Sequence, residues 1–99
     1  MYEDDWLMRQ FRQLALVVAN LARGERVEED GIEAAVREAT GMEATSLDAL
    51  APEALAGLLI DEDPRSRDRL LAVAQALEAS NRPDRRAKGR WLRERLSAT

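Results

Sequence analysis

The chain has 99 residues and a formal net charge of −4, and it contains neither His nor Cys. This length fits one domain over residues 1–99, and no apolar run approaches the roughly 20 residues that span a bilayer. Without His and Cys the chain lacks the usual members of catalytic triads, proton shuttles near neutral pH, disulfide frameworks and zinc sites. We therefore expect a cytoplasmic protein that is not an enzyme, uses no cofactor or metal and does not enter a membrane.

Residues 3–22 predict a long first helix, with Asp4 and Asp5 in its first turn and Gly24 just past its end. Its apolar residues recur at alternating steps of four and three, at Leu7, Phe11, Leu14, Val18 and Leu21. This spacing is typical of a coiled-coil seam, although the same stripe also suits a helix that lies across its own core. The helix has more apolar residues than one face needs, so we favour a homodimer that uses this stripe as its self-association face.

Two weaker segments follow. Residues 28–42 predict a second helix that Gly41 closes, and its apolar face consists of Ile32, Ala35, Val36 and Ala39. Residues 45–60 predict one or two short helical turns, in which Thr45 and Asp48 resemble a capping box and Pro52 occupies a first helical position. Leu55, Leu58 and Leu59 are expected to face inward.

The last third predicts a helical hairpin. Asp63 caps and Pro64 begins a helix that extends to residue 80, with Leu70, Val73, Ala74 and Leu77 on one face and a left-handed Asn81 at its end. Pro83 begins the final helix, whose apolar side is expected to consist of Ala87, Trp91, Leu92 and Leu96. No segment alternates apolar and polar residues over enough positions to predict a strand. The expected fold is all-α, with about five helices and one long N-terminal helix packed on shorter hairpins.

The stretch "DDWLMRQFRQLALVVANLARG" at residues 4–24 resembles the opening helix of an uncharacterised family of small bacterial helical proteins, a domain of unknown function. The matching positions, an acidic residue, an aromatic, an apolar pair and Arg, are Asp5, Trp6, Leu7, Met8 and Arg9. Residues 48–81 fit the middle portion of that family. These are packing motifs, so the resemblance implies a fold more than an activity.

The C-terminal hairpin is similar to a tetratricopeptide repeat. Leu70, Val73, Ala74 and Leu77 match the first helix of that repeat by size. Ala87 and Trp91 match the second helix if the turn is one residue longer than usual. About three repeats are needed to bury a continuous core, and the chain holds no second copy. The resemblance therefore implies one repeat-like hairpin without a repeat groove for peptides.

Charge is divided unevenly along the chain. Residues 1–63 carry 15 acidic and 5 basic residues, a net of −10, whereas residues 64–99 carry 4 acidic and 10 basic residues, a net of +6. The C-terminal basic patch consists of Arg82, Arg85, Arg86, Lys88, Arg90, Arg93 and Arg95. It could bind phosphates with Trp91 stacked on a base, form a solvated face, or pair with the acidic half of the same chain or of a second copy.

We favour the pairing with acidic residues, because the acidic chain as a whole opposes binding to nucleic acid. The sequence thus predicts a non-enzymatic helical domain for protein–protein interaction or structure, which associates with itself through the N-terminal helix. An Arg-rich C-terminal helix that contacts nucleic acid is the alternative.

Overall fold

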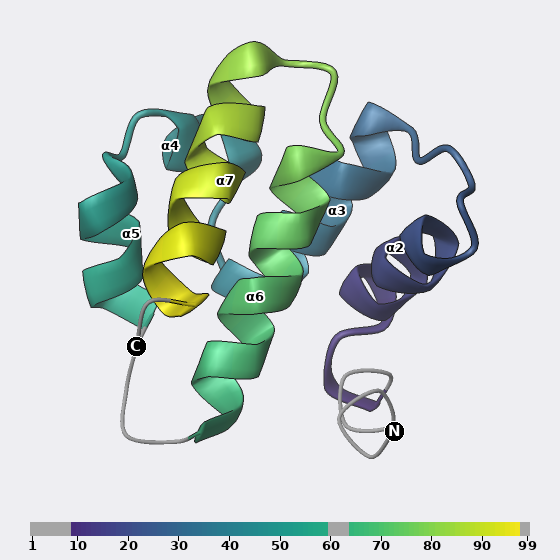
Figure 1. The fold of residues 1–99 in the computed structure, drawn as a ribbon, viewed down its shortest axis with the longest axis horizontal. Coiled ribbons are helices and arrows are strands. Elements are labelled where there is room, and N and C mark those ends of the chain that lie inside the picture. The colour runs from purple at the N-terminus through teal and green to yellow at the C-terminus, as the bar shows by residue number, and fades with distance from the viewer. Residues whose placement is uncertain (1–8, 60–63, 98–99) are drawn as a thin grey trace.

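The computed structural model describes residues 9–59 and 64–97, which contain helices and no strand. The helices are α2 (Arg12–Ala22), α3 (Glu29–Thr40), α4 (Ala44–Asp48), α5 (Pro52–Leu59), α6 (Pro64–Glu78) and α7 (Pro83–Ser97). Helix α6 lies in the middle and contacts α2, α3, α5 and α7 (Figure 1). The all-helical prediction is confirmed for these residues. The segment expected to hold one or two turns forms both α4 and α5.

None of the helices in the described ranges combines the length and the apolar composition that crossing a membrane requires.

The continuous first helix predicted over residues 3–22 is wrong in its described part. Arg9 and Gln10 are helical, but Phe11 leaves the helical conformation with φ −137° and ψ 78°, and α2 begins only at Arg12. Glu38 on α3 makes this break tolerable. Its Oε1 accepts hydrogen bonds from the backbone N–H groups of Gln13 at 2.8 Å and Leu14 at 3.3 Å. A carboxylate at this end stabilises the helix because it faces the positive pole of the helix dipole. Glu38 lies 24 residues from Leu14 in the sequence, so no local sequence pattern predicts that it caps α2.

The two glycine ends are confirmed. Gly24 has φ 73° and Gly41 has φ 75°, in the left-handed region that glycine adopts at little cost. After α2 the N–H of Glu25 donates to the carbonyl of Asn20 at 2.8 Å, and that of Gly24 donates to Leu21 at 3.0 Å. This pair of hydrogen bonds is a Schellman motif, and it fixes where Glu25 lies relative to α2.

Two predicted caps are wrong. Asn81 is not left-handed, since no described residue other than glycine has positive φ. Its backbone N–H instead donates to Glu29 Oε1 at 3.0 Å, which ties the turn after α6 to α3. Thr45 does not cap α4, because that helix begins at Ala44 and has no side-chain cap. Asp48 makes ion pairs described below rather than completing a capping box.

The predicted core of α3 and α6 is confirmed, since every apolar residue placed on their inner faces is buried. Pro52, Pro64 and Pro83 each occupy the first position of a helix, as expected. Leu55 is buried, whereas the side chains of Leu58 and Leu59, together with Asp63 and residues 1–8, lie outside the described part.

Helix α7 buries a different face from the predicted one. Leu92 and Leu96 are buried as expected, but Ala87 is exposed and Trp91 is only half-buried. The other buried residues of this face are Arg85, Lys88 and Gly89. Two of these residues are charged. The hydrophobic pattern therefore predicted the wrong buried face for the first half of α7.

Candidate functional site

Arg85, at the N-terminal end of α7, is the centre of a buried ion cluster. Only 1% of its surface is exposed. Its Nε and Nη2 donate to the two carboxylate oxygens of Asp48 at 3.0 and 2.8 Å. Its Nη1 donates to Glu29 at 2.7 Å and to Glu33 at 2.9 Å. One guanidinium therefore joins α7 to both α3 and α4, in the planar two-pronged geometry that arginine offers to carboxylates.

A second layer of contacts surrounds this cluster. The hydroxyl of Ser80 donates to Glu29 at 2.6 Å. Arg82 forms an ion pair with Asp48 at 3.0 Å and another with Asp84 at 2.8 Å. Because Ser80 and Arg82 lie in the turn between α6 and α7, the cluster also fixes that turn.

The electrostatics of the cluster favour fixed charges. The hydrogen bond from Arg85 lowers the pKa of Asp48. Burial opposes ionisation of Glu29, but hydrogen bonds from Ser80, the Asn81 backbone and Arg85 outweigh it and lower that pKa too. The same Asp48 hydrogen bonds raise the pKa of Arg85 above its ordinary value. The lowered pKa values of Asp48 and Glu29 and the raised pKa of Arg85 favour the charged forms, so the cluster joins α3, α4 and α7 through opposite charges.

Lys88 also joins α7 to α4, one helical turn after Arg85. It is buried, and its Nζ donates to the backbone carbonyl of Leu47 at 2.6 Å. Burial lowers the pKa of this amine, because the charged form loses its hydration. Within the described ranges no group of three or more acidic side chains is placed to hold a metal ion.

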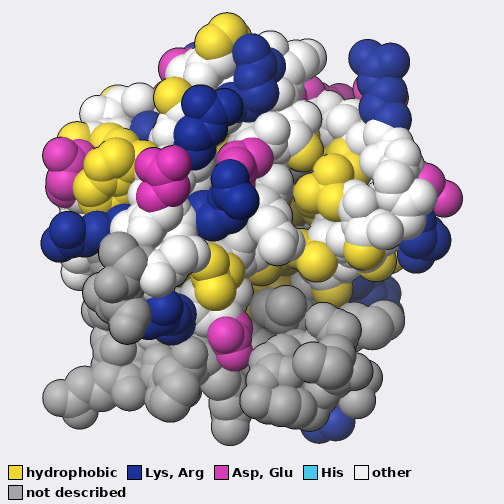
Figure 2. Space-filling model, viewed as in Figure 1, with side chains coloured by type: hydrophobic (Ala, Val, Ile, Leu, Met, Phe, Trp, Pro, Cys, Tyr) yellow, Lys and Arg dark blue, Asp and Glu magenta, His cyan; other side chains and the backbone are white. Residues whose placement is uncertain are grey.

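Some residues of the predicted basic patch make contacts within the chain, and others are exposed. Arg82, Arg85 and Lys88 are engaged within the chain, as is Arg93, which pairs with Glu78 at 2.9 Å. Arg86 donates to the carbonyl of Ser80 at 3.0 Å. Arg90 and Arg95 are exposed, and Figure 2 shows basic side chains gathered over α7. The pairing with the acidic half, in the same chain, thus accounts for Arg82 and Arg85.

The residues of the predicted self-association face also differ in burial. Leu14 is fully buried in the chain's own core, Phe11, Val18 and Leu21 are partly buried against that core, and Leu7 lies outside the described residues. A stripe that includes Leu14 is therefore not available as a whole to a second copy of the folded chain.

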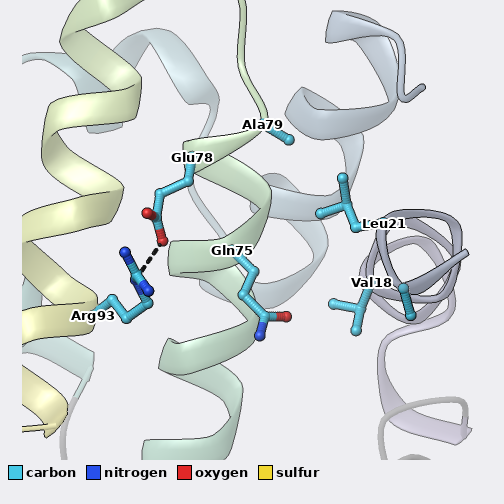
Figure 3. A pocket seen from close by; sticks show the side chains of 7 residues that line it. Val18, Leu21, Gln75, Glu78, Ala79 and Arg93 are labelled. Atoms are coloured by element: carbon cyan, nitrogen blue, oxygen red, sulfur yellow. Dashed lines mark ion pairs between the residues drawn. The ribbon is translucent and has the colours of Figure 1, made fainter. Parts of the chain in front are cut away.

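Val18 and Leu21 border a groove of about 490 Å³ between α2 and α6. Both side chains point from α2 toward Gln75 of α6 and toward Ala79, which follows the end of α6. The Glu78–Arg93 ion pair lies at the other side of α6 (Figure 3). Figure 2 shows hydrophobic side chains in the hollow between these helices.

A second apolar surface lies on the outer side of α2. Arg12, Ala15, Leu16 and Ala19 line a hollow of about 390 Å³. Half of the surface of Leu16, 50%, is exposed. The heptad pattern places Leu16 outside the seam, and the signal that pointed to this surface was the excess of apolar residues on the helix.

Comparisons of the chain with protein-family models, with curated proteins and with solved structures find no match.

Proposed function

We propose that this chain is a non-enzymatic helical interaction domain that associates with a second copy through α2. The observation that carries the proposal is the distribution of apolar residues around this helix. Eight of its 11 residues are apolar, yet only Leu14 and Val17 are buried. Leu16 is exposed, and Val18 and Leu21 are half-buried beside the groove.

The two apolar surfaces of α2 adjoin one another. At 100° per residue, Val18 and Ala22 at the groove are followed around the helix by Ala15, Ala19 and then Leu16. Helix α2 packs on α3 and α6, and no other described helix covers this side of it. Its small alanines permit another helix to approach closely. A two-fold pair is the commonest way in which soluble proteins cover such a face.

The chemistry of the described residues supports a binding role over an enzymatic one. The carboxylates around Arg85 are all paired with its guanidinium, and the pairing lowers the pKa of Asp48 and of Glu29. The nucleic-acid alternative has less support, because Arg82, Arg85 and Lys88 make contacts inside the chain and only the outer arginines of α7 are left for phosphates.

The mass in solution tests this proposal. We expect light scattering of the full chain at micromolar concentration to give twice the chain mass. Leu16→Asp places a charge on the uncovered face and is expected to give the monomer mass. Ala87→Asp is the matched control, since Ala87 is exposed on α7, away from α2. A monomeric wild type, or a Leu16→Asp variant that stays dimeric, would contradict the proposal.

The resemblance of the α6–α7 hairpin to a tetratricopeptide repeat stays a prediction. The buried series on α6 supports it. The residue that meets Ala74, however, is Gly89, while Ala87 is exposed. The cytoplasmic location and the resemblance to the bacterial helical family also stay predictions.

A further inference from the structure

We infer that the groove between α2 and α6 receives an amphipathic helix of a partner protein, with acidic residues on the flank that faces α7. The groove supplies the apolar contacts, and Arg86, Arg90 and Arg93 on α7 supply the charge. This inference does not rest on the self-association proposed above. The exposed Leu16 that tests that association lies about 160° around α2 from Val18 at the groove.

Aliphatic side chains form most of the lining of the groove. Val18, Leu21 and Ala22 line it from α2, and Gln75 of α6 and the following Ala79 line the facing side (Figure 3). Val18, Leu21 and Ala79 are only partly buried, so part of their surface is open to a partner. An apolar groove between helices is a surface on which the apolar side of another helix binds. The described part of the chain contains no strand, so an extended peptide has no sheet edge there to join.

Three arginines follow one side of α7 beside this groove. Arg93 lines the groove itself, and Arg86 and Arg90 precede it by seven and three residues. At 100° per residue, all three lie within about 60° of one another around α7. Figure 2 shows basic side chains over α7 on the same face of the molecule as the apolar hollow between α2 and α6. A helix in the groove therefore has these arginines along one of its flanks.

The charge of these arginines is only partly neutralised within the chain. Glu78 pairs with Arg93 at 2.9 Å, yet 52% of the Arg93 side chain stays exposed. Arg86 donates to the backbone carbonyl of Ser80, and Arg90 is exposed. Neither Arg86 nor Arg90 forms an ion pair with a residue of the described ranges. Their guanidinium groups are therefore available to carboxylates of a partner.

The excess of positive charge is confined to the α7 side of the groove. Past Leu21 and Ala79 the groove meets a hollow in which Glu25 and Glu28 lie together with Arg26. Acidic residues of a partner gain nothing from this mixture of charges. We therefore expect them on the flank toward α7 and not along the whole partner helix.

A nucleic acid fits the same surface less well. None of the described lining residues is aromatic, so an unpaired base finds no side chain in the groove on which to stack. A phosphate backbone would bind the arginines but leave the aliphatic lining uncovered. An acidic amphipathic helix satisfies both parts of the surface.

Selection of binding peptides tests the inference. A phage-displayed library of alanine-rich helical peptides, randomised around the helix, is selected against the full chain. We expect the selected peptides to share aliphatic residues along one side and Asp or Glu on one flank. Fluorescence anisotropy should then show that Arg90→Glu weakens a selected peptide about tenfold. Replacing the acidic flank of that peptide by Lys should restore its binding to Arg90→Glu. Ala22→Glu, which places a charge in the groove at an exposed position, should abolish binding.

Arg95→Glu is the matched control, because Arg95 is exposed about 140° around α7 from Arg90 and should not affect the peptide. Circular dichroism checks the fold of each variant, and Arg90→Gln replaces Arg90→Glu if that variant does not fold. The inference is wrong if no peptide is enriched, if the selected peptides show no excess of acid, or if Arg90→Glu leaves their binding unchanged. Tighter binding of a single-stranded oligonucleotide that Arg90→Glu weakens would assign the surface to phosphates instead. Self-association that Arg90→Glu abolishes would assign the groove to a second copy of the chain.

Discussion

The guanidinium of Arg85 and the carboxylate of Asp48 form a two-pronged ion pair, with N–O distances of 3.0 and 2.8 Å. Arg85 is almost fully buried, whereas Asp48 keeps 14% of its side chain exposed. The pair joins α7 to α4 across 37 residues of sequence, and Glu29 and Glu33 add α3 to the same guanidinium. One side chain, that of Arg85, therefore connects three helices at this end of the molecule.

Arg85→Met is expected to lower the free energy of unfolding by about 3 kcal/mol, because it leaves three carboxylates without their shared cation. Arg85→Lys keeps the charge but loses the two-pronged geometry, so we expect an intermediate loss. Urea denaturation measures both. Arg90→Met on the exposed side of α7 is the control and should change the value by less than about 0.5 kcal/mol. An equally small effect of Arg85→Met would show that the cluster contributes nothing to stability.

The cluster also predicts a loss of stability in acid. The pKa values of Asp48 and Glu29 in the folded chain lie below their ordinary values of 3.8 and 4.5. A lowered folded-state pKa stabilises the fold above the unfolded-state pKa, and this contribution disappears as the pH falls through the folded-state pKa. The free energy of unfolding should therefore fall from about pH 5 downward.

Asp48→Asn isolates the part that Asp48 contributes. Near neutral pH the variant should be less stable than the wild type. The difference should shrink as the pH falls, because a protonated Asp48 resembles Asn. Urea denaturation over a pH series gives this difference directly, and a difference that does not vary with pH would rule out Asp48 as one of the groups responsible.

Local signals in the sequence were sufficient to place five of the helix ends. Gly24 and Gly41 end helices, and three prolines begin them, because each of these residues acts on the backbone within one turn. The inner faces of α3 and α6 were also predictable, since their buried residues are apolar and follow the helical period.

The parts that the sequence did not predict depend on residues distant in the chain. Phe11 interrupts the first helix where Glu38 is present to cap the next segment. Arg85 and Lys88 are buried only because Asp48 and the Leu47 carbonyl are in place to receive them. A hydrophobicity pattern scores both cations as exposed, so it missed the ion cluster and the buried face of α7.

Glu38→Ala is expected to destabilise the chain by about 1 kcal/mol, because it removes the carboxylate that accepts the N–H groups of Gln13 and Leu14 at the start of α2. Glu38→Gln keeps an oxygen acceptor and should lose less. Thermal denaturation followed by circular dichroism ranks the two variants. Equal loss in both would mean that the charge, and not the hydrogen bond, stabilises this helix end.

Gly89 of α7 packs directly against the backbone of α6, and Gly89→Ala is expected to destabilise the hairpin. A Cβ atom at this position would lie 2.6 Å from the Ala74 carbonyl oxygen and 2.9 Å from the Glu78 backbone nitrogen. These are backbone atoms, so the two helices must separate. We expect a net loss of about 1–3 kcal/mol, even though alanine favours the helical conformation.

Gly57→Ala on α5 is the matched control for that substitution. A Cβ atom at Gly57 would meet no atom of the described residues within 4 Å, so we expect the gain in helix propensity to dominate. This variant should therefore be more stable than the wild type, by up to about 1 kcal/mol. Urea denaturation of the two variants should move the unfolding midpoint in opposite directions. The same direction in both would show that the α6–α7 hairpin can relax around a methyl group, and that glycine is not required there for close packing.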